Sequence, residues 1–459
     1  MTASPRISAA FLGVSRAAPP RNAAPIAGLD GAIMSKHSFS LVWVAALLWS
    51  VSAQAGEHWP AWRGPTGDGH SDEKNLPLTW GGKTQENILW KAPLFPSDKI
   101  KRDQNQSSPI VWGDRIFVTL SYWPAGTTEK DFPEHHLICF QAKDGKKLWD
   151  TRIPPGPWKL TDLRGGYTAP TPATDGKHVY VSFGSAVVAA VDFQGAIAWR
   201  NEINPHSFDV AWAASPVLFE STVIVVCDQQ DHASTIYAFD GKTGAVRWET
   251  KRPNVEWAHS TPLLAKVAGK LQLLTATHNG PQGLDPTTGK ILWSYRTDPQ
   301  VGDTVTPTAR DGLVYVDSGR GGPGIAVDAT GMGDLPKTAL KWKVAVQSGF
   351  SSPILVGDNL YRLHGSDVLS CWRWTTGADV LKKDRLEGAD SAVSPFATAD
   401  GRIYFASTGK SYVVKAGPKL EILARNDLGD PSRASPAVAA GRIYIKGGRF
   451  LYCIGAKKD

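Results

Sequence analysis

The sequence predicts an all-β fold, an eight-bladed β-propeller of four-stranded antiparallel blades, and three observations lead to it. The 459 residues include 45 Gly, 32 Pro and 18 Trp but only three Met, which favours turns and strands over long helices. A segment of related sequence recurs eight times along the chain. A tryptophan occupies the same place in most of these repeats.

The N-terminal region has the pattern of an export signal. Residues 1–33 show no apolar periodicity, and we interpret Met34 as the true start and the preceding residues as a non-native extension. A basic residue, an apolar run at Leu41–Val51 and the motif AQA then predict a signal peptide over residues 34–55. The alternative is a membrane anchor or a buried helix, but the run is short for a bilayer span. We expect a mature chain that starts near Gly56, is periplasmic or extracellular, and keeps no stable membrane anchor.

Charge gives little information about partners. The formal net charge is +7, of which residues 1–55 contribute three, so the mature chain carries about +4. Its longest basic run is KIKR at residues 99–102, too little for a nucleic-acid-binding surface. We therefore expect no nucleic acid among its partners.

The four cysteines lie far apart, and each is inside an apolar run that is typical of a strand. They are Cys139, Cys227, Cys371 and Cys453. Without an adjacent pair or a C-x-x-C motif, we expect four buried free thiols, because unpaired Cys packs as a small apolar residue. A disulfide, which an oxidising compartment would permit, is the alternative.

Each repeat opens with a small residue and Pro, followed by a strand-like run and a tight turn. The openings lie roughly 40 to 60 residues apart, near the spacing of four-stranded propeller blades. They are SSPIVWGDRIFVTL at Ser107, TPATDGKHVYVSF at Thr171, ASPVLFESTVIVVC at Ala214, STPLLAKVAGKLQLLTA at Ser260, TPTARDGLVYVDS at Thr306, SSPILVGDNLYRLH at Ser351, SPFATADGRIYFAS at Ser394 and ASPAVAAGRIYIKG at Ala434. The propeller is thus expected over residues 107–459.

The second half of each repeat predicts a third strand, a turn containing Gly, and a fourth strand that carries Trp in five repeats. The sixth and seventh repeats have aliphatic residues there, and the eighth ends before its fourth strand. The run ENILWKAPL at residues 86–94, inside the N-terminal segment 56–106, has the fourth-strand pattern. We expect it to complete the last blade, which would join the chain ends and remove an exposed sheet edge. The Trp residues expected to dock neighbouring blades are Trp90, Trp149, Trp199, Trp248, Trp293 and Trp342.

The blade sequences AFDGKTGAVRW and GLDPTTGKILW resemble the tryptophan-docking repeat of the pyrroloquinoline-quinone (PQQ) propeller superfamily. That superfamily includes quinoprotein alcohol dehydrogenases and the periplasmic propeller of the outer-membrane-protein assembly machinery. The N-terminal run HWPAWRGPTGDGHS, followed by ILWKAPL, is also similar to PQQ-like repeat proteins. The resemblance covers the chain from about Trp59 to its C-terminus. It implies the fold but not the activity, because function resides in sites and not in the blade pattern.

The motifs of the redox members are missing from the chain. The resemblance would imply a PQQ–Ca²⁺ pair, a catalytic Asp and often a vicinal disulfide, or C-x-x-C-H where haem is bound. The chain has no adjacent cysteines and no C-x-x-C-H, and no calcium set can be matched to it. We therefore assign no catalytic residue, no metal ligand and no firm cofactor, and PQQ with calcium is kept as the alternative.

Two further patterns suggest chemistry and are set aside. Gly319, Gly321 and Gly324 have dinucleotide-binding spacing, but a strand-like run follows them where a helix is required. His135 and His136 are neighbours at the start of a strand, so their side chains point to opposite faces and do not form one zinc site.

The loops that lead into the blades are the predicted binding surface. In a propeller they cross the top face near the central channel, where mixed charges and aromatic residues suit a small polar ligand or a peptide. The alternative is that each residue only stabilises its own loop. The candidates are Gln104, Arg164, Tyr167, Asp209, Trp212, Trp257, His259, Asp303, Asp390 and Arg433.

Two functions follow from these observations. The first is an exported binding or scaffold protein of the cell envelope that holds envelope proteins or a small polar ligand at its top face. The second is a PQQ- and Ca²⁺-dependent dehydrogenase of alcohols or sugars. The sequence does not decide whether the chain is an enzyme, and it does not assign an oligomeric state.

Overall fold

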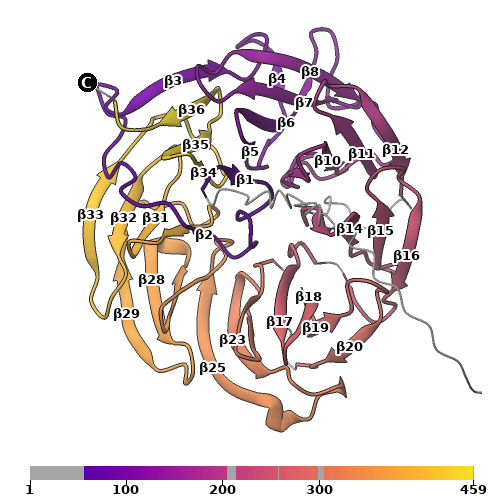
Figure 1. Cartoon of the computed structure of the whole chain (residues 1–459), viewed down its shortest axis with the longest axis vertical. Coiled ribbons are helices and arrows are strands. Elements are labelled where there is room, and N and C mark those ends of the chain that lie inside the picture. The colour runs from indigo at the N-terminus through magenta and orange to yellow at the C-terminus, as the bar shows by residue number, and fades with distance from the viewer. Residues whose placement is uncertain (1–55, 204–212, 257, 298–303, 458–459) are drawn as a thin grey trace, which may run out of the picture. The chain divides into compact units, whose positions relative to one another are not determined.

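The computed structural model describes residues 56–203, 213–256, 258–297 and 304–457, all within one compact unit, Ala53–Asp459. Eight sheets follow one another around a central axis in chain order (Figure 1). The predicted all-β, eight-bladed propeller is therefore confirmed. The signal peptide and the N-terminal extension lie outside the described residues.

The first four blades contain the following strands. Blade 1 has β5 (Ile110–Trp112), β6 (Arg115–Trp123), β7 (Glu134–Gln141) and β8 (Lys147–Ile153), with β1 (His58–Trp59) beside β5 and β4 (Lys101–Arg102) beside β6. Blade 2 has β9 (Ala173–Thr174), β10 (His178–Phe183), β11 (Val187–Asp192) and β12 (Ile197–Glu202). Blade 3 has β13 (Val217–Phe219), β14 (Thr222–Cys227), β15 (Thr235–Asp240) and β16 (Val246–Lys251). Blade 4 has β17 (Leu263–Val267), β18 (Lys270–Thr277), β19 (Gly280–Leu284) and β20 (Ile291–Ser294), extended by β24 (Gly333–Asp334).

The other four blades complete the ring. Blade 5 has β21 (Thr308–Arg310), β22 (Leu313–Val316), β23 (Arg320–Asp328) and β25 (Leu340–Ser348). Blade 6 has β26 (Ile354–Val356), β27 (Asn359–Leu363), β28 (Val368–Arg373) and β29 (Asp379–Arg385). Blade 7 has β30 (Phe396–Thr398), β31 (Arg402–Phe405), β32 (Ser411–Lys415) and β33 (Glu421–Asn426), with β2 (His70–Ser71) beside β30. Blade 8 has β34 (Ala437–Ala439), β35 (Arg442–Lys446), β36 (Phe450–Ile454) and β3 (Ile88–Pro93).

Helix is confined, within the described residues, to two short 3₁₀ turns, η1 (Lys337–Ala339) and η2 (Gly365–Asp367). None of the described helical segments has the length and apolar character needed to cross a bilayer.

Burial falls from the middle of each blade to its rim. In blade 3, every residue of β14 is buried, and its sequence TVIVVC is continuously apolar or small. The outer strand β16, VRWETK, alternates between exposed and partly buried positions. A strand that packs against a neighbouring blade on both faces needs apolar residues throughout, whereas an outer strand needs them on alternate positions only.

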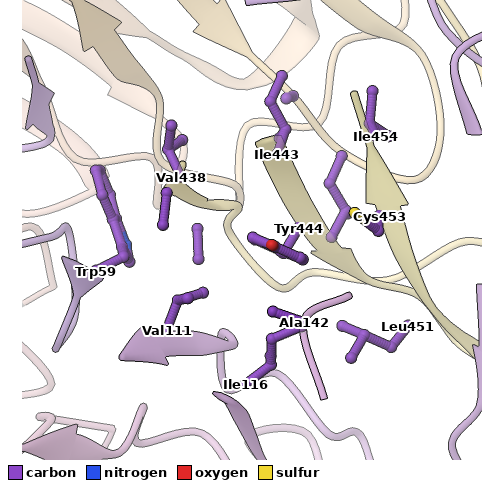
Figure 2. Close-up of a cluster of buried hydrophobic side chains, with 14 of the residues drawn as sticks. Trp59, Val111, Ile116, Ala142, Val438, Ile443, Tyr444, Leu451, Cys453 and Ile454 are labelled. Atoms are coloured by element: carbon purple, nitrogen blue, oxygen red, sulfur yellow. The ribbon is translucent and has the colours of Figure 1, made fainter. Parts of the chain in front are cut away.

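The last blade takes its outer strand from the N-terminal part of the chain. β3 pairs antiparallel with β36, with Trp90 opposite Cys453, so the propeller closes through hydrogen bonds between the two ends of the described chain. A buried cluster packs on this seam (Figure 2). In it, Val111 and Ile116 of blade 1 face Val438 and Tyr444 of blade 8. Full burial of an aliphatic side chain contributes about 1.5–3 kcal/mol, so the seam is held by apolar contact as well as by strand pairing.

The recurrent tryptophans lie at the outer rim of the seams. Trp199 of blade 2 lies against Gly244 of blade 3, where a Cβ atom would be 2.7 Å from the indole, and its Nε1 donates to the Gly241 carbonyl at 2.8 Å. Gly244 has φ +72°, so the turn requires glycine for its backbone as well as for the close approach. In four more pairs the indole ring lies against the glycine in the same way: Trp90–Gly145, Trp149–Gly195, Trp248–Gly289 and Trp342–Gly377. Nε1 of Trp90, Trp149 and Trp342 also donates to a carbonyl of the next blade.

Trp293 docks differently. It is fully buried, and its Nε1 donates to Gln272 Oε1 of its own blade at 2.7 Å. All six predicted tryptophans thus have structural positions on the outer strands, away from the channel.

The four cysteines are free and buried. Burial raises the pKa of Cys139, Cys371 and Cys453 to about 12, which keeps these thiols protonated and unreactive at neutral pH.

Candidate functional site

A ring of Ser and Thr side chains surrounds the channel at the start of the blades. Every blade opens with Ser-Pro or Thr-Pro, and in seven of the eight blades the hydroxyl accepts a hydrogen bond from the backbone N–H of its counterpart in the preceding blade. The ring consists of Ser108, Thr171, Ser215, Thr261, Thr306, Ser352, Ser394 and Ser435. Seven of the eight links have this form, at 2.9–3.1 Å, and Ser435 N donating to Ser108 Oγ closes the ring. Between blades 4 and 5, Ser260 Oγ donates to the Val305 carbonyl at 2.8 Å instead.

The repeat of Ser/Thr-Pro has a physical reason. A buried backbone N–H needs an acceptor, and here a side chain supplied by the next blade provides it. The proline that follows has no N–H of its own, which removes one donor from a crowded inner surface. The small-residue-and-Pro openings that mark the repeats in the sequence are therefore the parts that join the blades around the channel.

The residues from β1 to β2 form a loop, which we call the N-terminal loop, and both strands lie near the centre of the molecule (Figure 1). β1 pairs with β5, and β2 pairs in parallel with β30, so the N-terminal loop is fixed to the inner strands of blades 1 and 7. His58 lies opposite Trp112, at the end of β5 that is remote from the hydroxyl ring. The N-terminal loop thus enters from the far end of the channel.

The tip of the N-terminal loop reaches the hydroxyl ring. Trp62 Nε1 donates to Thr306 Oγ1 at 3.0 Å, and the buried Arg63 donates through Nη2 to the Pro353 carbonyl at 2.7 Å. Burial lowers the pKa of Arg63 to about 10, which still leaves it charged at neutral pH. Gly64, at φ +84°, lies against the Trp59 ring, where a Cβ would be 2.8 Å away. The motif W-P-A-W-R-G-P therefore contains the end of β1 and the tip of the N-terminal loop.

On the other side of the ring, the loops that lead into the blades surround a cavity of about 660 Å³. This size is within the range of small-molecule and peptide sites. We call it the central pocket. Its lining residues are Trp62, Gln104, Gln106, Arg164, Gly165, Ala169, Ala213, Ser215, His259, Thr261, Thr304, Thr306, Arg320, Phe350, Ser352, Ala392 and Arg433.

Four of the predicted site residues line the central pocket: Gln104, Arg164, His259 and Arg433. They come from the loops that lead into blades 1, 2, 4 and 8, so residues far apart in sequence are brought together by the circular fold. Gln106, on the same loop as Gln104, donates to the carbonyls of Arg164 and Gly165 at 3.1 Å. This contact ties the first two loops to each other.

Tyr167 and Asp390 do not line the pocket, contrary to prediction. Tyr167 is buried in a separate cluster with Trp123 and Leu160, and its hydroxyl accepts a hydrogen bond from Leu160 N at 3.0 Å. Burial raises the pKa of Tyr167 to about 12. Asp390 accepts from Ala392 N at 2.9 Å within its own loop. The remaining candidates, which are Asp209, Trp212, Trp257 and Asp303, lie outside the described residues.

Sequence reasoning missed Trp62, Arg320 and Phe350. Arg320 begins β23 and lies beside the glycines that have dinucleotide-binding spacing. Phe350 precedes the Ser-Ser-Pro of blade 6. Trp62 belongs to the conspicuous N-terminal motif, but the motif alone does not show that this residue reaches the channel. The eight Ser and Thr residues are part of the repeat openings in the sequence, but the sequence does not show that their hydroxyls link neighbouring blades.

The described lining of the central pocket contains several basic side chains. It contains three arginines and a histidine, and no Asp or Glu side chain. Arg164 pairs with the neighbouring Asp162, and the Arg164 side chain remains 83% exposed in this pair, so solvent screens the interaction. Calcium requires several converging oxygen ligands, usually carboxylates. The described lining offers guanidinium, amide and hydroxyl groups, and the described residues contain no group of three His, Cys, Asp or Glu placed to hold a metal. Among the described lining residues, the donor set does not supply the carboxylates that a calcium ion beside PQQ needs.

The blade architecture and the docked tryptophans define the chain as a PQQ-like β-propeller. The protein-family model described as "Outer membrane protein assembly factor BamB" matches residues 133–383, more than half of the chain. The chain belongs to this family.

Relatives agree with this assignment. The outer membrane protein assembly factor BamB of Yersinia pestis is 23% identical over 259 residues, which are 50% of this chain and 60% of that protein. Among solved structures, BamB from Moraxella catarrhalis has a TM-score of 0.54 at 15% identity, covering 80% of this chain and 98% of that one. The quinohemoprotein alcohol dehydrogenase from Comamonas testosteroni has a TM-score of 0.62 at 12% identity, covering 87% and 81%. At these identities the structural likeness concerns the fold alone.

Proposed function

We propose that the chain is an exported scaffold of the cell envelope that takes part in the assembly of outer membrane proteins and binds its partner at the central pocket. Membership of the assembly-factor family supports the process. The signal-peptide pattern at residues 34–55 supports export. The chain matches 60% of the length of its curated relative, so the role in assembly is carried over as a proposal.

One observation carries the proposal of a binding site. Loops from all eight blades meet at one pocket, while the protein's own N-terminal loop occupies the channel on the other side of the hydroxyl ring. A partner can therefore approach from one side only, over a surface made of loops on a rigid scaffold. Such loops are where binding residues concentrate in proteins. Gln104, Arg164, His259 and Arg433 are the proposed contacts.

Deletion of the gene tests this role. We expect outer membrane proteins to fall in amount in quantitative proteomics of envelope fractions, and wild-type chain to restore them. A chain with Arg164→Glu and Arg433→Glu should restore them less well, because the mouth of the pocket reverses its charge. Lys143→Glu with Lys242→Glu makes the same charge change on exposed outer turns and should restore fully. Unchanged outer membrane proteins in the deletion strain would refute the proposal.

A PQQ-dependent dehydrogenase is the second candidate, favoured by one feature of the pocket. Guanidinium groups such as those of Arg164, Arg320 and Arg433 pair well with carboxylates, which PQQ carries. When bound, PQQ would supply the redox chemistry, and these arginines would orient it. The missing calcium ligands in the described lining weigh against this candidate. Titration of the purified chain with PQQ and Ca²⁺ decides: a bound quinone spectrum with dye reduction by alcohols or sugars supports it, and no binding at micromolar PQQ rejects it.

A further inference from the structure

Two buried residues next to the loops of the central pocket form an ion pair that fixes part of its lining. We propose that Asp317 and Arg362 are positioning residues of the pocket, and that they hold Phe350 at its wall as a preformed contact for an apolar group of the partner. This inference rests on the proposed binding role and deepens it. It follows from a closed set of hydrogen bonds, from the burial of the pair and from the exposure of Phe350.

The ion pair joins two neighbouring blades. Asp317 directly follows β22 of blade 5, and Arg362 belongs to β27 of blade 6. The guanidinium donates through Nε and Nη2 to the two carboxylate oxygens, each at 3.0 Å, and both side chains are fully buried. Although burial by itself raises the pKa of Asp317, the charge and hydrogen bonds of Arg362 hold that pKa below its ordinary value, so the pair is ionised. A paired, charge-assisted contact of this kind has a defined geometry.

The ion pair is also bonded to the backbone of two loops of the pocket. Gly319 N donates to Asp317 Oδ1 at 3.0 Å, and Arg362 Nη2 donates to the Gly349 carbonyl at 2.6 Å. Gly349 N in turn donates to the Gly319 carbonyl at 2.7 Å. The two side chains and the two glycines thus form a closed cycle of hydrogen bonds. The residue that follows each glycine in the sequence lines the central pocket.

The two glycines allow the loops to approach each other closely. Gly319 has φ +72°, and a Cβ atom there would be 3.3 Å from Cδ1 of Phe350, so the ring packs against this turn. A Cβ at Gly349, which has φ +149°, would be 2.8 Å from Gly365 N. Backbone with positive φ is accessible to glycine and strained for other residues. The position of Phe350 is thus set by the glycine before it and by the turn that its ring contacts.

Phe350 is 46% exposed although its loop is fixed by buried groups. Its ring is part of the pocket lining. A large aromatic side chain gains free energy when its surface is buried, and it is a frequent anchor of binding sites. A contact that is already ordered loses little conformational entropy when a partner binds. An exposed ring on a fixed loop is therefore suited to contact an apolar group.

A second buried pair has the same chemistry and serves as the control. Asp228 directly follows β14 of blade 3, as Asp317 follows β22 of blade 5. It accepts a hydrogen bond from Arg252 Nη2, and both side chains are buried. Thr275 and Gln282, the other side chains that bond Arg252 in the described part of the chain, lie outside the pocket lining. Loss of this pair should leave the two pocket loops unchanged.

Hydrogen exchange, measured by mass spectrometry on the full mature chain, tests the positioning role. The test variant is Tyr315→Phe/Asp317→Leu/Arg362→Met. Replacement of a whole buried ion pair by apolar residues often preserves stability, and Tyr315 is changed because its hydroxyl donates to Asp317. We expect the amides of residues 317–322 and 347–352 to exchange at least about tenfold faster than in wild type, while those of β14 keep their rate. The control Asp228→Leu/Arg252→Met should not accelerate exchange in these two segments.

Arg362→Lys provides the same measurement if the triple variant does not fold. Its ammonium keeps a cation beside Asp317, but one nitrogen replaces the fork that reaches both the carboxylate and the Gly349 carbonyl. Exchange in the same two segments should be several-fold faster than in wild type. Wild-type exchange rates in the folded variants, or an equal acceleration in the control, would overturn the positioning role. Thermal unfolding of each variant separates local loosening from loss of the fold.

Complementation of the deletion strain tests the contact itself. Phe350→Ala removes an exposed ring and keeps the cycle of hydrogen bonds, so exchange in the two segments should remain near that of wild type. We expect this variant and the triple variant to restore less than about half of the outer membrane protein that wild type restores, and the control pair variant to restore it fully. Full restoration by Phe350→Ala would overturn the role of Phe350. A deletion strain without a phenotype would refute the proposed function and the contact with it, whereas the exchange rates decide the positioning role independently.

Discussion

At the seam between blades 2 and 3, Trp199 reaches across to the next blade, where it lies on Gly244 and donates to the Gly241 carbonyl. At the seam between blades 4 and 5, Trp293 turns back and donates to Gln272 of its own blade. The second seam is held instead by β24, which belongs to the connection between β23 and β25 and pairs in parallel with β20. Its Asp334 accepts from Ser294 Oγ at 2.7 Å.

The difference shows what the docking contact requires. Blade 3 offers a tight turn, DGKTG, whose last glycine leaves room for an indole ring. Blade 5 has the longer connection DATGMGDLPKTALKW, which cannot present a compact glycine turn to Trp293. A tryptophan at this position of the fourth strand can thus dock on the following blade or bond within its own blade. The turn of the following blade decides between the two.

The largest effect is expected from Trp199→Ala at the regular seam. Removal of a large buried aromatic side chain leaves a cavity and costs about 3–5 kcal/mol in the free energy of unfolding. Trp199→Phe keeps an apolar plate and loses the hydrogen bond to Gly241, so about 1–2 kcal/mol is expected. Urea unfolding followed by tryptophan fluorescence and circular dichroism measures both. If the two variants cost the same, the hydrogen bond and not the apolar contact would be the docking interaction.

A third kind of seam, between blades 8 and 1, should make the free energy of unfolding depend on pH. Lys446 of β35 is fully buried, and its Nζ donates to Ser107 Oγ at 2.7 Å and to the Thr119 carbonyl at 3.3 Å. Burial lowers the pKa of Lys446 to about 7, although the nearby Asp103 acts in the opposite direction. In the unfolded chain the amine keeps its ordinary pKa of about 10.4. Above pH 7 the unfolded state therefore binds more protons, and the free energy of unfolding rises with pH.

We expect the wild type to gain about 2 kcal/mol relative to Lys446→Met between pH 6.5 and 8.5. The comparison with the variant cancels the contribution of the thiols, which titrate in the same way in both proteins. Unfolding midpoints at the two pH values provide the measurement. A difference between the two proteins that is independent of pH would mean that Lys446 is charged, or neutral, at both values in the folded chain.

Gln272→Leu removes the hydrogen-bond acceptor of Trp293 at the seam between blades 4 and 5. No single side-chain substitution does the same at the seam between blades 2 and 3. At the regular seam the acceptor is a backbone carbonyl, whereas Trp293 depends on a side chain that can be replaced. The substitution leaves a buried indole N–H without its partner and should cost about 1–3 kcal/mol. Ser294→Ala, in the same seam, loses only an exposed contact with Asp334 and should cost less. Because the seams lie far apart, the costs of Gln272→Leu and Trp199→Ala should add, and strong non-additivity would contradict independent seams.

Sequence reasoning could predict the blades because each blade's pattern is local. Alternation, turns and Trp positions lie within about 50 residues, and even the strand around Trp90 could be assigned because the eighth repeat lacks a fourth strand. Gln104 and Arg433 could be selected as pocket residues because they lie in the loops that lead into the blades. What could not be predicted depends on the ring as a whole. Whether Tyr167 points to the channel or into a cluster with Leu160 is decided by neighbours that the repeat does not specify.

The tip of the N-terminal loop is a second example. Trp62 and Arg63 contact Thr306 and Pro353, which lie more than 240 residues away in sequence. Nothing local predicts these contacts, because the width of the channel depends on the number and tilt of all the blades. The hydroxyl ring was missed for a related reason. Seven of the eight hydroxyls accept a hydrogen bond from the backbone of a neighbouring blade, so a single repeat does not reveal this role.

The smallest expected effect is that of Ser394→Ala in the hydroxyl ring. Ser394 Oγ accepts from Ser352 N at 2.9 Å, and Ser394 lies outside the lining of the central pocket. Loss of this acceptor leaves one buried backbone N–H unpaired and should cost about 1 kcal/mol in the free energy of unfolding. Ser394→Thr keeps the hydroxyl and should restore most of the loss, because Thr171 and Thr261 already occupy equivalent places. Urea midpoints for the two variants measure the link. A cost near that of Trp199→Ala would mean that the inner ring, and not the outer tryptophans, is what holds neighbouring blades together.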